Sequence, residues 1–271
     1  MFEGRNRALV VLLVLGVLSA VSLSAKDEKL TPEVLVARHL AAIGTAEARA
    51  AAQSREIQGM VAFTEVVSHT INMVGHASMV SQGRTSKTVF DFATPGYKAE
   101  EFAFDGQTHT VSMVEPGKRS MLGDFLYAQR EILREGLWGG TMSTAWPLLN
   151  LSQAAPYLTY QGLKKVNKQS LHALLYEPRK RAGNGDLKIR LYFEPETFRH
   201  VLTIYTLTTH DIHGSVKTGT DEVETVLEER FSDFGEEGGI TLPRHWQIRY
   251  RQSDTQKPRI YQWEMSAETA K

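Results

Sequence analysis

The feature that most constrains the fold of this chain is an alternation of apolar and polar residues with a period of two. The first stretch places Ile57, Gly59, Val61 and Phe63 on one face of an expected strand. Such alternation is typical of a strand with one buried and one solvated face. Further strands are expected at about residues 71–80, 86–93, 97–104, 107–114, 157–166, 170–178, 187–194, 198–209, 223–234, 244–252 and 258–266.

Short turns separate many of these strands, and their brevity determines the strand direction. Turn signals stand at Asp105-Gly106, Pro116-Gly117, Asn184-Gly185 and Gly238-Gly239. Strands joined by so few residues must be antiparallel, because a parallel return needs roughly a dozen residues or more. About twelve strands exceed the usual size of an open sheet, so curling toward an open barrel is expected. We predict an α+β fold: a large curved antiparallel β-sheet, an unclosed half-barrel, with helices packed on its concave face.

Two short helices are expected before the first strand. Thr31-Pro32-Glu33 is a helix start signal, because Thr caps the first turn, Pro fits the first helical position and an acid follows. Gly44 is expected to end this helix, and Thr45 to begin a second one that runs to about Gln53. His39 lies near the end of the first helix, where the helix dipole tolerates a cation.

A helical insert is expected at about residues 121–151, between the early and the late strands. Its first piece has one apolar face, formed by Leu122, Phe125, Leu126, Ile132 and Leu133. A second helical piece is expected from Ser143 to Leu151, which includes Trp146. The segment 136–140 between the pieces is rich in glycine and is not expected to be regular.

Large apolar side chains are expected to share the concave face of the sheet. In the late strands, for example, Trp246, Ile248 and Tyr250 alternate with polar residues. Such residues are usually core, but incomplete closure of the helices over the sheet would leave an apolar cavity for a lipid or acyl group. The residues expected to line this ligand site are Phe90, Phe92, Phe102, Phe104, Trp138, Trp146, Leu191, Phe193, Tyr205, Trp246, Ile248 and Tyr250.

The first residues of the chain have the order of a secretory signal peptide. Arg5 and Arg7 precede an apolar run from Ala8 to Leu18, and small residues follow up to Ala25. The whole run is shorter than the roughly 20 residues that span a bilayer. We therefore expect residues 1–25 to be a signal peptide, and residues 26–271 to form a single domain of an exported, periplasmic or secreted protein.

Charge and cysteine content exclude several classes of function. The chain has 31 basic and 31 acidic residues and no cysteine. A balanced charge argues against a nucleic-acid-binding protein, which would show a basic excess. Without cysteine there is no disulfide, no thiolate metal site, no Cys nucleophile and no Cys-linked lipid anchor. No cofactor is expected.

No motif in the sequence identifies a catalytic chemistry. The chain lacks a phosphate-binding glycine loop, a nucleophile elbow and the zinc-protease His pair. The densest polar group is His210, Asp211 and His213, which lie beside a Gly- and Thr-rich stretch where polar residues are normal. Adjacent carboxylates such as Glu100-Glu101 and Glu228-Glu229 point to opposite faces of a strand, so they are not expected to form a catalytic pair.

Several segments together resemble the LolA/LolB-like periplasmic carriers, of the outer-membrane lipoprotein-sorting type. The resemblance lies in the order of a signal peptide, a short N-terminal helix and an antiparallel meander with a helical insert. The segments that carry it are Leu30-Thr31-Pro32-Glu33, His39 to Gly44, Phe104-Asp105-Gly106, Leu191 to Phe198, Phe231 to Phe234 and Ile240 to Pro243. It implies an unclosed β-barrel with a lid of helices over an apolar cavity for acyl chains.

The leading hypothesis is a non-catalytic, exported carrier of a lipid or an acylated protein, with envelope membrane proteins as further partners. The segment Trp138-Gly139-Gly140 and the helix with Trp146 are the expected lid. One alternative is an envelope protein-interaction or sensor module of the same fold. The other is a metal-dependent envelope hydrolase that uses His210, Asp211 and His213.

Overall fold

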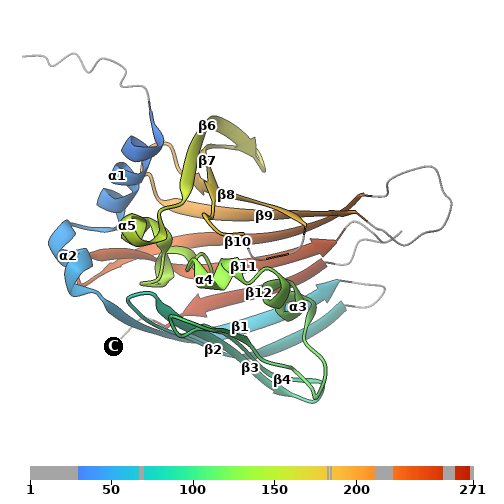
Figure 1. The fold of residues 1–271 in the computed structure, drawn as a ribbon. Coiled ribbons are helices and arrows are strands. Elements are labelled where there is room, and N and C mark those ends of the chain that lie inside the picture. The colour runs from blue at the N-terminus through green and yellow to red at the C-terminus, as the bar shows by residue number, and fades with distance from the viewer. Residues whose placement is uncertain are drawn as a thin grey trace, which may run out of the picture.

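A 12-stranded antiparallel sheet dominates the computed structural model, which describes residues 30–66, 70–181, 183, 185–210, 222–252 and 260–268 (Figure 1). The strands lie side by side in the order β5-β4-β3-β2-β1-β12-β11-β10-β9-β8-β7-β6. Their bounds are β1 Ser54–Val66, β2 Thr70–Gln82, β3 Thr85–Thr94, β4 Tyr97–Phe104, β5 His109–Val111, β6 Tyr157–Val166, β7 Gln169–Glu177, β8 Asp186–Phe193, β9 His200–His210, β10 Glu222–Glu237, β11 Ile240–Gln252 and β12 Ile260–Ala267.

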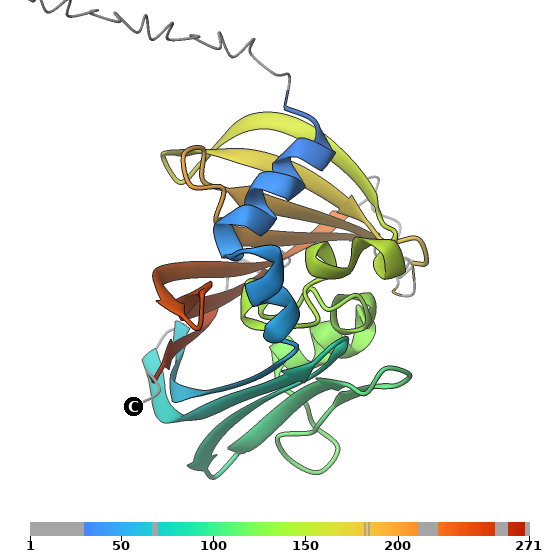
Figure 2. The same cartoon turned by 90° about the vertical axis from the view of Figure 1, so that its left-hand side faces the viewer.

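The sheet consists of two meanders that meet at the first and the last strand. β1 to β5 form one meander and β6 to β12 the other, and β1 pairs with β12 from Gly59↔Ala267 to Val66↔Ile260. The edge strands β5 and β6 stand at opposite ends of this order, so the sheet curls without closing (Figure 2). The predicted unclosed antiparallel half-barrel is confirmed.

The strand boundaries differ from the predicted ones mainly at two places. β5 contains only three residues, although a longer strand was expected there. β11 begins at Ile240, four residues before its predicted start, and therefore includes Pro243. A proline is tolerated at this point because β12 pairs with β11 only from His245 onward, so the start of β11 has a partner strand on one side only.

Two helices cross the open end of the half-barrel, as Figure 2 shows: α1 Pro32–Ile43 and α2 Ala46–Ala51. The predicted cap is present, because the Thr31 Oγ1 accepts a hydrogen bond from the N–H of Val34 at 3.3 Å. One face of α1 is buried and consists of Leu35, Val36, His39 and Ile43. The helix ends at Gly44, where an added Cβ would lie 2.4 Å from the carbonyl oxygen of Gly239.

The helical insert joins the two edge strands across the concave side of the sheet (Figure 1). It comprises α3 Met121–Ala128, α4 Glu131–Arg134, the 3₁₀ turns η1 Gly140–Met142 and η2 Pro147–Asn150, and α5 Leu151–Ala154. We refer to residues 121–154 as the insert. The predicted apolar face of its first piece is buried. The helix expected from Ser143 is wrong, because Trp146 adopts the extended conformation that a following proline favours (ψ 120°) and helical structure begins only at Pro147.

The insert and the concave face share one hydrophobic core. Every residue from Gly136 to Leu148 is buried, and so are the side chains that the sheet presents to them. All four tryptophans of the chain lie in this core, at most 2% exposed. The insert is therefore an internal layer of the molecule and not a loop on its surface.

Candidate functional site

The twelve residues predicted to line a ligand site lie together in the core. They come from β3, β4, β8, β9, β11 and the insert, and all are less than 10% exposed. The ring centroids of Trp138 and Trp246 are 4.8 Å apart, those of Phe102 and Trp138 5.3 Å, and those of Phe90 and Trp246 6.0 Å. Trp138 of the insert thus lies against aromatic side chains of β4 and β11, and Phe90 of β3 packs on Trp246 in turn.

The insert fills the space that was expected to be a cavity. The twelve residues and the apolar residues of the insert are buried together in one hydrophobic core. A ligand in contact with the aromatic side chains of the sheet would have to displace at least part of the insert. The ligand role of these residues therefore remains a prediction, and what holds the insert in place becomes the central question.

Glu229 of β10 lies at the centre of this interface, fully buried beneath the insert. Its Oε1 accepts a hydrogen bond from the Tyr205 hydroxyl at 2.7 Å, and its Oε2 accepts one from the N–H of Gly139 at 2.8 Å. Burial raises the pKa of Glu229 to about 8, and the hydrogen bonds from Tyr205 and Gly139 oppose this rise. The side chain connects the sheet directly to the backbone of the expected lid segment.

Glu100 of β4 is a second buried carboxyl, and it holds the start of α3. The Ser120 hydroxyl lies 2.7 Å from its Oε1, and the Tyr97 hydroxyl donates to its Oε2 at 2.6 Å. Ser120 also accepts a hydrogen bond from the N–H of Gly123 and thereby caps α3. Burial raises the pKa of Glu100 to about 7, against the lowering effect of its hydrogen bonds.

His39 of α1 connects the second half of the insert to the N-terminal helix. Its Nε2 accepts a hydrogen bond from the indole N–H of Trp146 at 3.1 Å, and its Nδ1 lies 3.0 Å from the carbonyl oxygen of Phe198. This pair of contacts requires the neutral ring with the proton on Nδ1. Burial lowers the pKa of His39 to about 4. Trp146 also stacks on His200, with ring centroids 4.5 Å apart.

Further polar contacts hold the insert from other strands. The Tyr176 hydroxyl donates to Glu135 at 2.9 Å, and the guanidinium of Arg55 donates to the carbonyl oxygen of Thr141 at 2.6 Å. The N–H of Thr144 donates to the Ser81 hydroxyl at 3.0 Å. The insert is thus attached to its surroundings by separate side-chain hydrogen bonds along its length.

Some polar atoms of this interface are buried without a partner among the described residues. They are the indole Nε1 of Trp138 and the hydroxyl oxygens of Thr88 and Thr141, whose residues are all at most 2% exposed. A buried polar group without a hydrogen bond costs about 1–3 kcal/mol. The interface therefore combines tight apolar packing with polar groups that this arrangement does not satisfy.

The sequence patterns located some of these residues and missed others. Glu100 and Glu229 are each buried while their neighbours face outward, where Glu101 pairs with Lys87 at 3.0 Å and Glu228 with Arg230 at 2.6 Å. The expected divergence of adjacent carboxylates is therefore present, but its consequence, one buried acid from each pair, was not predicted. The strand alternation is the signal that could have revealed it, since it fixes which face each carboxylate shares.

His39 lies near the end of the first helix, as expected, and belongs to the buried face of α1. It is only 1% exposed and neutral, so it does not act as a solvated cation near the helix terminus. The apolar spacing of α1 places position 39 on the buried face beside Val36 and Ile43, and this spacing is the signal that could have identified it.

The histidine cluster considered for a hydrolase is not placed by the structure. His210 is the last residue of β9, and Asp211 and His213 lie outside the described residues. Within the described part of the chain, no group of three or more His, Asp or Glu side chains is arranged to hold a metal ion.

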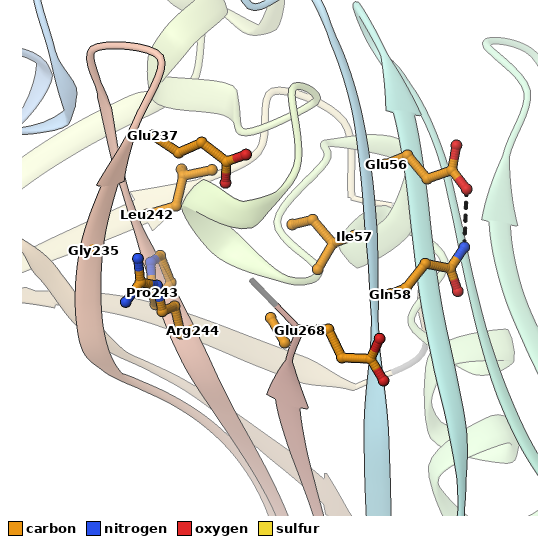
Figure 3. Close-up of a pocket in the computed structure, with 10 residues that line it drawn as sticks. Glu56, Ile57, Gln58, Gly235, Glu237, Leu242, Pro243, Arg244 and Glu268 are labelled. Carbon is orange, nitrogen blue, oxygen red and sulfur yellow. Dashed lines mark hydrogen bonds between the residues drawn. The ribbon is translucent and has the colours of Figure 1, made fainter. Parts of the chain in front are cut away.

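A surface groove lies at one end of the sheet, where β12 stops between β1 and β11. Its volume is about 500 Å³, and Figure 3 shows residues of these strands around it. An adjoining groove of about 370 Å³ continues beneath α2 and shares Glu56, Ile57, Glu237 and Leu242 with the first. This groove was not predicted, because it depends on where one strand ends relative to its neighbours.

Comparison with known proteins identifies similar solved structures at low sequence identity. A LolA superfamily protein from Nitrosomonas europaea is 10% identical, with a TM-score of 0.42, over 89% of this chain and 96% of that chain. A domain of the outer membrane lipoprotein-sorting type from Vibrio parahaemolyticus is 8% identical, with a TM-score of 0.45, over 87% and 94%. The complex of MucA and MucB from Pseudomonas aeruginosa matches at 10% identity and a TM-score of 0.22, over 86% and 94%.

No protein-family model matches the chain, and no curated protein matches its sequence. The fold assignment stands on the strand order and register described above. No helix among the described residues has the length and apolar character needed to cross a membrane. The expected signal peptide, residues 1–25, lies outside the described residues.

Proposed function

We propose that this chain is an exported, non-catalytic carrier of a lipid or acyl group in the bacterial periplasm. Residues 1–25 would direct export, and residues 26–271 would form the carrier domain. The cargo would lie between the aromatic side chains of the concave face and the insert, which acts as a lid. The observation that supports this proposal is the attachment of the insert to an aromatic wall through buried polar groups.

The polar attachment distinguishes a lid from a permanent core layer. Each hydrogen bond to the insert can be exchanged for one to water when the insert moves outward, so the net cost of breaking it is only about 1 kcal/mol. Release also relieves the buried, unpaired atoms of Trp138, Thr88 and Thr141. What chiefly keeps the insert in place is then the burial of its apolar residues, which an acyl chain can replace.

The transfer free energy of an acyl chain is large enough to compensate for displacing the insert. An acyl chain of about 16 carbons gains up to about 13 kcal/mol on leaving water, at about 0.8 kcal/mol per buried CH₂. A ligand shifts a conformational equilibrium by its differential affinity for the two states. An acyl chain that contacts Phe90, Phe102 and Trp246 only when the insert is displaced would therefore favour the open state.

Native mass spectrometry of the protein purified from the periplasm, combined with lipid extraction, tests this function. The proposal expects a population with the added mass of a bound lipid, which extraction removes and identifies. Recovery of only the unliganded protein, together with no uptake of added fatty acid or phospholipid, would contradict it.

A second candidate is an envelope protein-interaction or sensor module. The groove at the end of β12 favours this candidate, because it is open to solvent and flanked by strand edges. The two functions are compatible in one molecule, since the groove and the insert–sheet interface involve different residues.

A further inference from the structure

β12 ends at Ala267, and within the described part of the chain its end leaves two strands without a partner on the sides that face each other. β12 pairs with β1 only as far as Gly59 and with β11 only as far as His245. Among the described residues, Ser54 to Gln58 of β1 and Ile240 to Arg244 of β11 therefore have no strand between them. Just after β12 ends, the backbone N–H of Glu268 still donates a hydrogen bond to the carbonyl oxygen of Gln58 in β1, at 2.8 Å.

The backbone of β1 offers hydrogen-bonding groups toward this gap. In an antiparallel strand the N–H and C=O of one residue point to the same side, and successive residues alternate. Because Gln58 faces the line of β12, Glu56 and Ser54 face it too. We use the name slot for the groove bounded by residues 54–58 of β1 and 240–244 of β11 and closed at one end by Ala267 and Glu268.

The two faces of the slot differ in chemistry. Ile57 and Leu242 pack against the hydrophobic core and are only half-buried, so they provide an apolar inner surface. Glu56 and Gln58 are exposed on the opposite side of β1 and are joined by a hydrogen bond of 2.9 Å (Figure 3). Glu268 lies across from Gln58 and is exposed as well, so the outer rim carries two carboxylates.

The remaining charges near the slot do not neutralise this rim. Arg244 lines the groove, but its guanidinium lies against Gly235, where an added Cβ would be 2.3 Å from its Cζ. Glu237 is a third exposed carboxylate of the lining. No ion pair to Glu56, Glu237 or Glu268 is present among the described residues. The slot therefore has acidic character on its exposed side.

We propose that the slot is a docking site for an extended peptide segment of a partner protein, with alternating apolar and basic residues. The peptide would continue the line of β12 as an added strand and pair antiparallel with β1 and β11. Its apolar side chains contact Ile57 and Leu242, and its Lys or Arg side chains lie beside Glu56 and Glu268. About five peptide residues match the unpaired length of β1. This site is separate from the proposed acyl-binding interface.

Fluorescence anisotropy with short synthetic peptides tests the proposal on the full chain. The probe is a fluorescein-labelled peptide with alternating Val and Lys, and the matched control has Glu in place of Lys. The proposal expects saturable binding of the Lys peptide alone. It also expects the Glu56→Gln/Glu268→Gln double variant to bind about fivefold more weakly, because two exposed ion pairs are lost. Glu115→Gln, far from the slot, is the matched control variant and leaves binding unchanged.

Two further variants separate strand addition from simple charge attraction. Glu56→Pro removes an N–H that faces the slot while keeping the pairing of β1 with β2, so it is expected to bind more weakly than Glu56→Gln, which lacks the same carboxylate but keeps the N–H. Leu242→Asp is expected to weaken it as well, whereas Leu242→Met keeps the apolar surface and retains it. Hydrogen exchange at the amides of Ser54 and Glu56 is expected to slow when the peptide is bound.

Three outcomes would overturn the proposal. Equal binding of the Lys and Glu peptides would mean that the slot has no charge preference, and equal binding by Glu56→Pro and Glu56→Gln would mean that no strand is added. At least tenfold tighter binding after removal of residues 269–271 would assign the slot to the chain's own end and not to a partner. Lipid uptake by the insert–sheet interface is measured separately, so failure here leaves the carrier proposal unaffected.

Discussion

Buried titratable side chains lie where the insert meets the sheet and α1, and they respond to pH in opposite directions. The folded protein keeps Glu229 and Glu100 protonated up to about pH 8 and about pH 7, while both ionise near pH 4.5 in the unfolded chain. Their contribution to stability is therefore lost as pH rises through this range. His39 is neutral in the folded state down to about pH 4, so its contribution is lost as pH falls below 6.5.

The Glu229→Gln variant tests the carboxyl effect. The histidines that are buried in the folded protein still lose protons in the unfolded chain just above pH 6.5, but wild type and variant share this contribution, so it cancels in their difference. Between pH 6.5 and 8, the raised pKa of Glu229 is expected to lower the unfolding free energy of the wild type by about 2 kcal/mol. The Glu229→Gln variant does not show this decrease. Urea denaturation at the two pH values measures the difference. The variant Glu228→Gln, at the partly exposed neighbour on the outer face, serves as the control, and an identical pH slope in wild type and Glu229→Gln would refute the role of Glu229.

The His39→Phe variant tests the contact with Trp146. At pH 7 it leaves the buried indole N–H of Trp146 without an acceptor, which is expected to destabilise the fold by about 1–3 kcal/mol. The variant also loses the titrating ring, so wild type loses about 1.4 kcal/mol per pH unit relative to it between pH 6.5 and 4, which narrows the deficit and reverses it near pH 4. Denaturation curves across this range provide the measurement, with the exposed His76→Gln as the control. A constant deficit would show that His39 does not titrate as described.

For single residues, the sequence predicted which face of a strand or helix a side chain occupies better than it predicted whether that side chain is buried. The alternation correctly separated Glu228 from Glu229, but burial depends on what lies across the sheet. The insert that covers Glu229 is 90 residues away from it at Gly139, and no local pattern encodes this contact. Likewise, the acceptor role of His39 depends on Trp146, which comes from a segment far along the chain.

At the level of elements, the insert is the segment whose structure depends most on tertiary contacts. Its helices are short, and the backbone between them is set by special residues. Gly136 has a φ of +74°, and an added Cβ there would lie 2.0 Å from the carbonyl oxygen of Ala145. Strands were predicted closely because a two-residue period is a local signal. The path of the insert was not predicted, because it depends on Pro147 and on packing against the sheet.

The Ser120→Ala variant tests how the insert is attached at its start. It removes both the cap of α3 and the hydrogen bond to Glu100, with an expected loss of about 1–3 kcal/mol. Faster hydrogen exchange should extend over Met121–Ala128, which mass spectrometry can follow. Thr45→Ala removes the exposed cap of α2 and is the matched control, with a smaller loss confined to that helix. Equal effects of the two variants would argue against a special role for the Glu100 contact.

In the whole molecule, the sheet remains unclosed, and the two meanders and the insert together enclose one hydrophobic core. The insert connects the two edge strands of an unclosed sheet, and its burial completes the core that the sheet alone would expose. The sequence predicted the curved sheet and the residues of its concave face. It could not predict whether that face is empty or covered, because the same aromatic residues suit a cavity and a packed core equally well.

The central claim is that the insert must leave the concave face for an acyl chain to bind. The backbone N–H of Thr144 in the insert donates to the Ser81 hydroxyl of β2, and the chain contains no cysteine, so a disulfide in the double variant Ser81→Cys/Thr144→Cys, its formation checked by mass spectrometry, would lock the insert to the sheet. Binding of a fluorescent palmitate analogue is measured with the oxidised and the reduced protein, and the two single variants are controls. We predict that the reduced protein and the single variants bind the probe and that the oxidised protein does not. Equal binding by the oxidised and reduced forms would contradict the account.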